Sequence, residues 1–200
     1  MISPSSASVR FLAATASGQD LDGTLKKIKS SGTITMGYRD GAPPFAFVGP
    51  NKEPVGYSVD LCKYVAAGIQ KQLGMDNLKV NWVPVTAENR IDMVVQGKID
   101  IECGTTTASL SRQERVDFSL MTFVDGGSLL ATSTANLQTL ADLVGKRIAV
   151  IPGTTTEKAL ADFMKKKSLA AETIQVKDHA DGVAALEAGR ADAFASDRGI

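Results

Sequence analysis

The chain has 200 residues, 44% of them hydrophobic, and its 22 lysines and arginines equal its 22 aspartates and glutamates, so the formal net charge is zero. This composition can fill the core of one large or two small domains and excludes disorder of the whole chain. Without a basic surplus we expect no nucleic-acid or anionic-membrane partner, and no stretch reaches the apolar length of a transmembrane helix.

Few residues in the chain could support metal or nucleophilic chemistry. The one histidine is His179, and neither it nor Cys62 and Cys103 belongs to a Cys-His cluster with metal-ligand spacing. No G-x-S-x-G nucleophile elbow is present. We therefore expect no metal, no cofactor and no catalytic residue. Two cysteines are consistent with one disulfide in an oxidising compartment, and equally with two buried thiols.

Residues 1–20 are rich in serine and alanine and show no amphipathic period. Ala14-Thr15-Ala16 has the small-x-small form that precedes a signal-peptidase cut, although a charged start and a continuous apolar core are absent. We interpret the segment as the remnant of a leader or as a disordered N-terminus.

Strands and helices alternate from residue 21 onward, which predicts mostly parallel sheets. In the first half, Ser58 is predicted to cap a long helix that Gly74 ends. The buried face of that helix is predicted from apolar residues at four-residue spacing: Leu61, Val65, Ile69 and Leu73. The first-half helices are expected over 21–29, 58–73 and 86–95, the strands over 33–38, 78–83 and 99–103, and a hairpin over 45–48 and 54–57.

The second half repeats the same alternation. Residues 120–132 are apolar and are broken by two glycines, which suits an extended crossing between two lobes. After this crossing, helices are expected over 139–143, 155–167 and 181–189, and strands over 147–151, 174–176 and 191–195.

The stretch 100–115 suggests a binding site for a small anion. A short strand stops at Gly104, the hydroxyls of Thr105–Thr107 follow, and a helical turn then carries Arg112 and Arg115. Ligands of open α/β sheets bind at the carboxyl ends of strands, where hydroxyls, N–H groups and a guanidinium can hold a carboxylate. A strand followed by a turn, a capped helix and a solvated arginine would explain the same residues.

A second strand end has similar chemistry at 152–157. Thr154 and Glu157 form a predicted capping box, and the same helix start could offer N–H groups to an anion. Asp197, just past the last strand, would add a carboxylate suited to an ammonium group. His179 precedes a helix and could be a cap or a surface residue.

These segments, taken together, carry a family resemblance. The sequence resembles the periplasmic amino-acid-binding proteins of ABC importers (solute-binding protein family 3), and within them the glutamate/aspartate-binding group. The resemblance covers roughly residues 21–200 in unbroken order. It rests on nine segments: 37–39 with 44–45, 55–60, 89–90, 100–107, 112–113, 116–119, 153–155, 177–179 and 187–193.

The resemblance implies an α/β, two-lobe, type II clamp that closes on one amino acid. It implies that Arg112 and Thr107 hold the α-carboxylate. Asp197 and the position of Thr105 would hold the α-ammonium group. The acidic side chain would be met by the remaining residues of the site: Arg39, Arg90, His179 and Thr155.

Charge agrees with an acidic ligand. Such a ligand carries −1, whereas Arg39, Arg90, Arg112 and Asp197 sum to +2, or more if His179 is protonated. A neutral or basic ligand would leave two arginines desolvated and unpaired, at a cost of several kcal/mol.

Some features depart from the family pattern. Ala87 stands where a serine often helps to bind the side-chain carboxylate, and Thr105 replaces a usual serine. Family members continue beyond the residue that matches Ile200. The resemblance therefore implies a missing C-terminal part, incomplete lobes at 21–120 and 121–200, and a chain that is poorly stable by itself.

The resemblance also implies a function. The protein would be a periplasmic, monomeric binding protein that delivers glutamate or aspartate to the membrane subunits of an ABC permease, with no chemistry. A disulfide between Cys62 and Cys103 is plausible in such an exported protein, and two unpaired core thiols are the alternative. The alternative functions are a cyclic-carboxylate dehydratase on the same fold, with Glu88 or His179 as general acid, and the ligand-sensing domain of a receptor.

Overall fold

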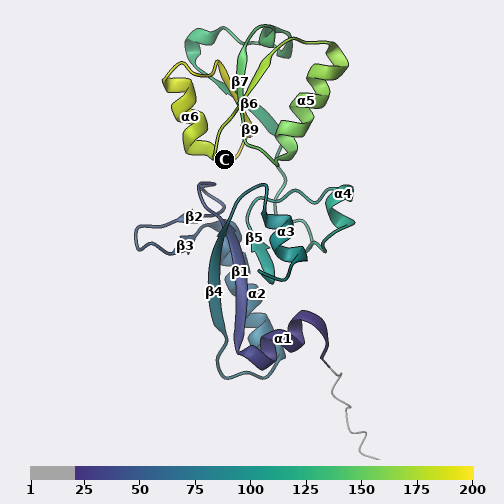
Figure 1. The fold of residues 1–200 in the computed structure, drawn as a ribbon. Helices are drawn as coiled ribbons and strands as arrows, with labels where there is room; N and C mark the ends of the chain where they lie inside the picture. The colour runs from purple at the N-terminus through teal and green to yellow at the C-terminus, as the bar shows by residue number, and fades with distance from the viewer. Residues whose placement is uncertain (1–20) are drawn as a thin grey trace, which may run out of the picture.

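The computed structural model describes residues 21–200. Two separate sheets divide these residues into a first lobe, at the bottom of Figure 1, and a second lobe, at the top. The predicted leader remnant at 1–20 lies outside the described residues. None of the helices within 21–200 has the length and apolarity needed to cross a bilayer.

The first lobe is built on a three-stranded parallel sheet in the order β4-β1-β5. A small antiparallel hairpin, β2 with β3, lies beside it, as predicted. Because the strands are parallel, their carboxyl ends meet at one edge of the sheet, which faces the second lobe in Figure 1. The elements are α1 (Gly23–Ser31), β1 (Thr33–Arg39), β2 (Phe47–Val48), β3 (Pro54–Val55), α2 (Tyr57–Gln72), β4 (Lys79–Val85), α3 (Arg90–Val95), β5 (Ile101–Cys103) and α4 (Leu110–Gln113).

The core of the first lobe lies between the sheet and helices α1 and α2. Ile28, Ile34 and Met36 are buried there together with both cysteines. Cys62 on α2 and Cys103 on β5 form a disulfide, with their Cα atoms 6.1 Å apart. The sequence left open a disulfide or two unpaired core thiols, and the structure has the disulfide.

The predicted buried face of α2 is right only toward its C-terminal end, where Leu73 is buried and Ile69 packs against the core. Val65 is 46% exposed, while Val59, Cys62 and Ala66 are buried. Residues four apart rotate by about 40° around a helix at each step, so a run of four-residue steps drifts off the core. The buried residues alternate three- and four-residue steps and stay on one stripe.

The predicted cap of α2 is also wrong. Ser58 lies inside the first turn, after the N-cap residue Gly56. The Ser58 hydroxyl donates instead to the carbonyl oxygen of Gly104 at 2.8 Å, which ties the start of α2 to the segment after β5.

The second lobe is a four-stranded sheet in the order β6-β9-β7-β8. Strand β7 is parallel to β8 and β9, and β6 runs antiparallel to β9, so the sheet is mostly parallel. Helices α5 and α6 lie on opposite sides of the sheet (Figure 1) and cover separate apolar clusters. The elements are β6 (Gly127–Ala131), η1 (Ser133–Ala135), η2 (Leu140–Leu143), β7 (Arg147–Val150), α5 (Thr155–Lys167), β8 (Glu172–Gln175), α6 (His179–Glu187) and β9 (Ala193–Asp197).

The two lobes share one local device. In each, an aspartate stands immediately before a strand, three residues after a glycine with positive φ. Asp100 accepts a hydrogen bond from the N–H of Thr35 at 2.8 Å, and Asp192 accepts one from the N–H of Arg147 at 2.8 Å. Each carboxylate therefore fixes the strand that follows it against the neighbouring strand.

Asp192 generates a prediction about acid stability. Hydrogen bonds from Arg147 lower the pKa of its carboxyl group below the usual value. A folded-state pKa below the unfolded one gives stability that is present above the unfolded pKa, about 3.9, and is lost as pH falls through the folded pKa. The variant Asp192→Asn should therefore lose less stability on acidification below about pH 4 than the parent, measured by thermal unfolding at a series of pH values.

The control is Asp162→Asn, whose partner is the exposed Lys158 on the same helix, and which should keep the parent's pH slope. An unchanged slope in Asp192→Asn would contradict the assignment.

Candidate functional site

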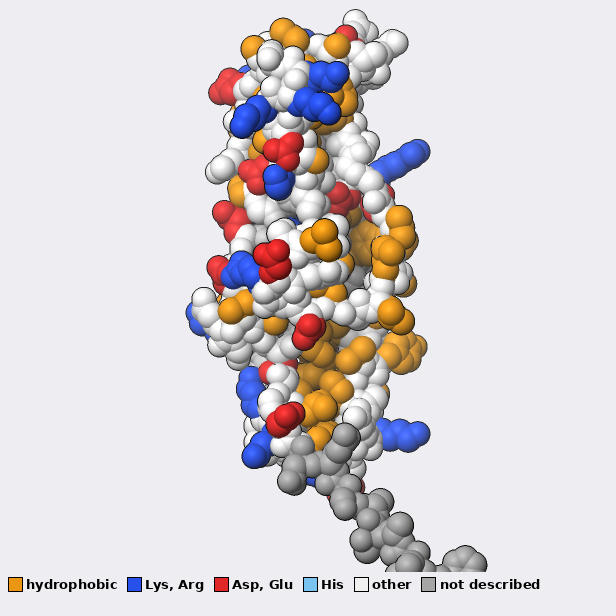
Figure 2. Space-filling view, turned by 90° about the vertical axis from the view of Figure 1, so that its right-hand side faces the viewer, with side chains coloured by type: hydrophobic (Ala, Val, Ile, Leu, Met, Phe, Trp, Pro, Cys, Tyr) orange, Lys and Arg blue, Asp and Glu red, His pale blue; other side chains and the backbone are white. Residues whose placement is uncertain are grey.

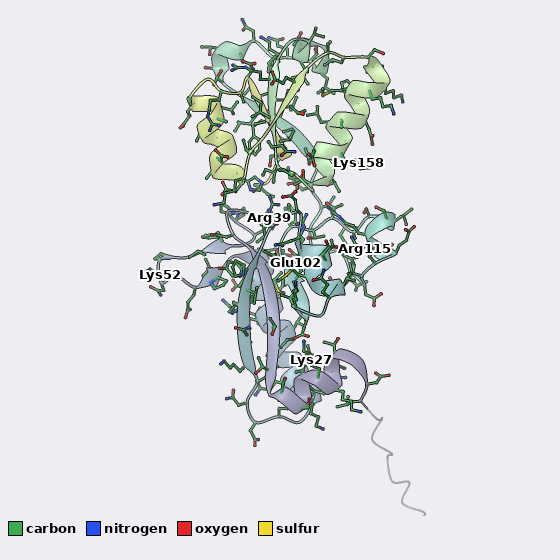
Figure 3. All side chains as sticks on the ribbon, viewed as in Figure 1. Lys27, Arg39, Lys52, Glu102, Arg115 and Lys158 are labelled. Carbon is green, nitrogen blue, oxygen red and sulfur yellow. A yellow bond between two sulfur atoms is a disulfide. The ribbon has the colours of Figure 1, made fainter. Side chains whose placement is uncertain are left out.

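The candidate site lies where the two lobes meet. Arg39 is the last residue of β1, and the segment 104–107 follows β5, so both leave the carboxyl edge of the first sheet. From the second lobe, Asp197 ends β9 and Thr155 begins α5. Figure 3 shows Arg39 at the junction of the lobes and Glu102 beneath it in the first lobe. This is the edge at which ligands of such sheets bind.

Arg39 is buried at this junction. Its side chain is 5% exposed, and Nη1 donates to Oγ1 of Thr105 at 3.1 Å. Burial lowers the pKa of Arg39, while the carboxylates of Glu102, Asp197 and Asp178 act in the opposite direction. Arg39 is therefore a largely desolvated cation surrounded by carboxylates.

Arg90 is the most deeply buried charged residue of the site. It is 2% exposed, and its Nε and Nη1 have no hydrogen-bond partner among residues 21–200. Burial lowers the pKa of Arg90 to about 10, Glu102 opposes this shift, and Arg39 and Arg112 reinforce it. A buried guanidinium with unpaired donors costs free energy until an acceptor reaches it.

A local turn positions Arg90. The predicted helix over 86–95 begins later, because residues 86–89 form a turn in which Thr86 and Asn89 bond to each other's backbone N–H groups. Arg90 is consequently the first residue of α3. The turn satisfies the backbone groups that an earlier helix start would have used.

Arg112 connects the two lobes. Its Nη1 donates to the carbonyl oxygen of Thr107 at 3.0 Å, and its Nη2 donates to that of Gly153 at 3.1 Å. Oγ1 of Thr107 lies 3.2 Å from Oγ1 of Thr155 across the same boundary. The two Thr-rich segments that the sequence singled out therefore face each other.

The start of α5 is capped, but not by the full box predicted. Oγ1 of Thr154 accepts the N–H of Glu157 at 3.1 Å, whereas the Glu157 carboxylate accepts the N–H of Gly153 at 2.9 Å. Within the same turn, the Thr156 hydroxyl donates to Asp197 at 2.7 Å. This bond fixes one oxygen of Asp197.

His179 is neither a cap nor a surface residue. The cap of α6 is Asp178, which accepts the N–H of Asp181 at 2.9 Å. His179 Nδ1 lies 2.8 Å from the carbonyl oxygen of Gly41 in the other lobe, which makes Nδ1 the protonated nitrogen. Burial, and then the charge of Arg39, lower the pKa of His179, so it is neutral at pH 7.

The lobes approach each other closely beside these residues. A Cβ added at Gly153, whose φ is +76°, would lie 2.9 Å from Cα of Glu88 and 3.0 Å from the carbonyl oxygen of Ala87. Ala87 is buried and joins the apolar cluster of the second lobe. The position at which the family pattern led us to look for a serine is thus a contact between lobes.

Glu102 is a site residue that the sequence reasoning missed. It lies on β5 between Ile101 and Cys103, which pack toward the first-lobe core, so its side chain leaves the opposite face. There it acts on the pKa values of Arg39, Arg90 and Arg112 alike. A carboxylate in the middle of a short apolar strand was the available signal.

A cavity of about 1100 Å³ opens beside the site. Four of the predicted residues line it, namely Thr105, Thr107, Thr155 and Asp197, whereas Arg39, Arg90, Arg112 and His179 lie outside its lining. The cavity continues along apolar side chains of the crossing between the lobes, such as Leu120, which is 92% exposed. Figure 2 shows hydrophobic side chains gathered along one side of the molecule.

The chemistry of the site is that of anion recognition. Three guanidinium groups, several hydroxyls and two carboxylates converge from both lobes, and arginine is suited to two-pronged binding of carboxylates. Within residues 21–200, no group of three or more His, Cys, Asp or Glu side chains is placed to hold a metal ion.

Comparisons with known proteins agree with this geometry. Residues 34–175 match the model of the bacterial extracellular solute-binding proteins, family 3. The chain is 43% identical over 202 residues to the L-glutamate/L-aspartate-binding protein of Pseudomonas aeruginosa, covering 98% of this chain and 67% of that protein. It is 36% identical over 185 residues to the glutamate/aspartate import solute-binding protein of Escherichia coli, covering 92% and 60%. The chain thus spans about three fifths to two thirds of the length of these relatives.

Solved structures have the same two-lobe architecture. A mutant of the arginine-binding protein ArgBP from T. maritima matches with a TM-score of 0.76 at 28% identity, over 87% of this chain and 72% of that one. The ancestral amino acid-binding protein AncCDT-1, a precursor of cyclohexadienyl dehydratase, also has a TM-score of 0.76, at 29% identity, over 88% and 74%. The predicted type II clamp is confirmed.

The burial of Arg90 predicts a gain in stability when its charge is removed. Arg90→Met replaces an unpaired buried guanidinium by an apolar chain of similar length, so the free energy of unfolding without ligand should rise by about 1–3 kcal/mol. Urea unfolding measures this change. Arg115→Met, which removes an exposed arginine paired with Asp92, is the control and should change stability by less than about 1 kcal/mol. A loss of stability in Arg90→Met would show that the guanidinium is satisfied.

Proposed function

The chain belongs to the bacterial extracellular solute-binding proteins of family 3, and from this premise we propose that it captures glutamate or aspartate between its lobes and delivers it to an ABC-type permease. It would do so outside the cytoplasm, in the periplasm, as a monomer. The disulfide supports such a compartment, because disulfides persist in oxidising surroundings.

The observation that carries this proposal is the unsatisfied guanidinium of Arg90 within a cluster of three arginines. An anionic side chain that reached Arg90 and Arg39 would pair with both charges. In the proposed complex, Arg112 and Thr107 hold the α-carboxylate, and Asp197 with Thr105 holds the α-ammonium group. The side-chain carboxylate is met by the other predicted residues: Arg39, Arg90, the neutral His179 and Thr155.

Charge favours an acidic ligand over the basic one that the ArgBP structures name. A cationic side chain beside three guanidinium groups would add like charge in a desolvated place, at a cost of several kcal/mol. A neutral side chain would bring no negative charge to the guanidinium of Arg90, and an apolar one would also leave its donors unpaired. The names of the relatives from Pseudomonas aeruginosa and Escherichia coli support the same ligand class.

The relatives named above are binding proteins, and we propose that this protein is likewise no enzyme. A dehydratase on this fold would need a general acid in the cleft. Of the two candidates, Glu88 is exposed, and His179 uses Nδ1 on the carbonyl oxygen of Gly41. A sensing role would depend on a signalling domain joined to the clamp.

Calorimetry of the protein against the twenty amino acids tests the proposal. Glutamate or aspartate is expected to bind with the lowest Kd, and glutamine and arginine with much higher Kd values. Arg90→Met should weaken binding at least about 30-fold, because truncating one partner of a buried, hydrogen-bonded charge pair costs 2 kcal/mol or more. Arg115→Met should bind as the parent does.

Two results would overturn the proposal. One is a preference for a neutral or basic amino acid. The other is turnover: formation of a product from a cyclic carboxylate, followed by chromatography, would show an enzyme on the same clamp.

A further inference from the structure

Glu102 has a position that the proposed ligand contacts do not use. On the neighbouring strand β1, Gly37 is paired with Glu102. Strand β5 ends at Cys103, and Gly104 is the next residue of the chain. A Cβ added at Gly104 would collide with Oε1 of Glu102 and would lie 3.4 Å from Cβ of Arg39. The Glu102 carboxylate therefore lies over the backbone of Gly104, which also adjoins Cβ of Arg39, and Figure 3 shows Glu102 beneath Arg39.

The Glu102 carboxylate is a counter-charge and not a partner in an ion pair. Its Oε1 is buried and has no hydrogen-bond partner among residues 21–200, and the same holds for Nε and Nη1 of Arg90. A structural ion pair would occupy both the carboxylate and the guanidinium. Here the donors of Arg90 are left for another acceptor, while the negative charge still acts on the nearby guanidinium groups.

We propose that Glu102 sets the net charge of the site to +1, so that the site selects a guest with one net negative charge. This inference rests on the proposed function. Arg39, Arg90 and Arg112 contribute +3, and Asp197 and Glu102 contribute −2. His179, whose pKa is lowered, adds no positive charge to this count. Asp178 is left out of the count because its carboxylate caps α6 by accepting the N–H of Asp181, although it also acts on Arg39.

The proposal makes Glu102 a specificity-determining residue. An acidic amino acid carries a net charge of −1, so its complex with a site of net charge +1 is neutral. The complex with glutamine keeps a net charge of +1, and the complex with glutarate, which lacks the ammonium group, has a net charge of −1. Buried charge is least costly when it sums to zero. Removing the charge of Glu102 would raise the site to +2 and shift its best match toward guests with two negative charges.

The test compares glutamate, glutamine and glutarate as ligands of the parent and of Glu102→Gln, by calorimetry. In the variant, the ratio of the Kd of glutamine to that of glutamate should rise on the order of tenfold, and the ratio of glutarate to glutamate should fall on the order of tenfold. The two ratios move in opposite directions because each guest differs from glutamate by one charge of opposite sign.

Two further variants separate charge from structure. Glu114→Gln makes the same change of total charge at an exposed position after α4 and should leave both ratios unchanged. Glu102→Asp keeps the charge and should keep both ratios within about threefold of the parent, which also tests the proposal if Glu102→Gln does not fold.

Three outcomes decide between the possibilities. Equal weakening of all three ligands, or unchanged ratios, in Glu102→Gln would overturn the role of Glu102 and leave the proposed function intact. Ratios in Glu102→Asp that shift by tenfold would overturn it as well. A parent protein that prefers glutamine or glutarate to glutamate would instead overturn the proposed function.

Discussion

The structure depends on keeping three like charges together, two of them away from water. Arg39 and Arg90 are almost fully buried, and Arg112 adjoins them from the segment after β5. Such a cluster is unfavourable by itself, since desolvation and mutual repulsion act in the same direction. The surrounding carboxylates reduce this cost, Glu102 from inside the first lobe and Asp197 from the second. A protein that stores positive charge in this way keeps unfavourable free energy that an anion can release.

Both lobes place their charged residues by the same local rules. Each has a parallel core sheet, with a helix, a positive-φ glycine and an aspartate before the strand whose far end leads into the site. The aspartate fixes the amino end of the strand, and the side chains that matter leave at the carboxyl end. Asp197 is the last residue of β9, which follows such an aspartate, and Arg39 is the last residue of β1, which pairs with β5. The two halves therefore present opposite charges to one boundary.

Much of this arrangement was predictable because glycine and periodicity mark the elements. The end of β5 before Gly104, the helix over 155–167 and the edge at which the hydroxyls meet all followed from local signals. The buried face of α2 followed only in part, because a repeat of four is only close to the helical period, and the packing of Cys62 and Ala66 leaves Val65 outside the core. The role of Glu102 was not predictable from local signals, because it depends on Arg39 and Arg90, which are distant in sequence. Its carboxylate makes no hydrogen bond through Oε1 that a motif could encode.

The cross-link between α2 and β5 has a mechanical consequence for such a clamp. Cys103 lies between Glu102 and Gly104, so the covalent bond anchors the residues on either side of it to the longest helix of the first lobe. The second lobe is joined to the first by the chain of residues 120–126 and is held against it by noncovalent contacts such as that of Thr107 with Thr155. Motion between the lobes would break those contacts while the covalently braced half kept its shape. The arrangement of Arg39, Arg90 and Arg112 in the first lobe would then be formed before the lobes close and would not change during closure.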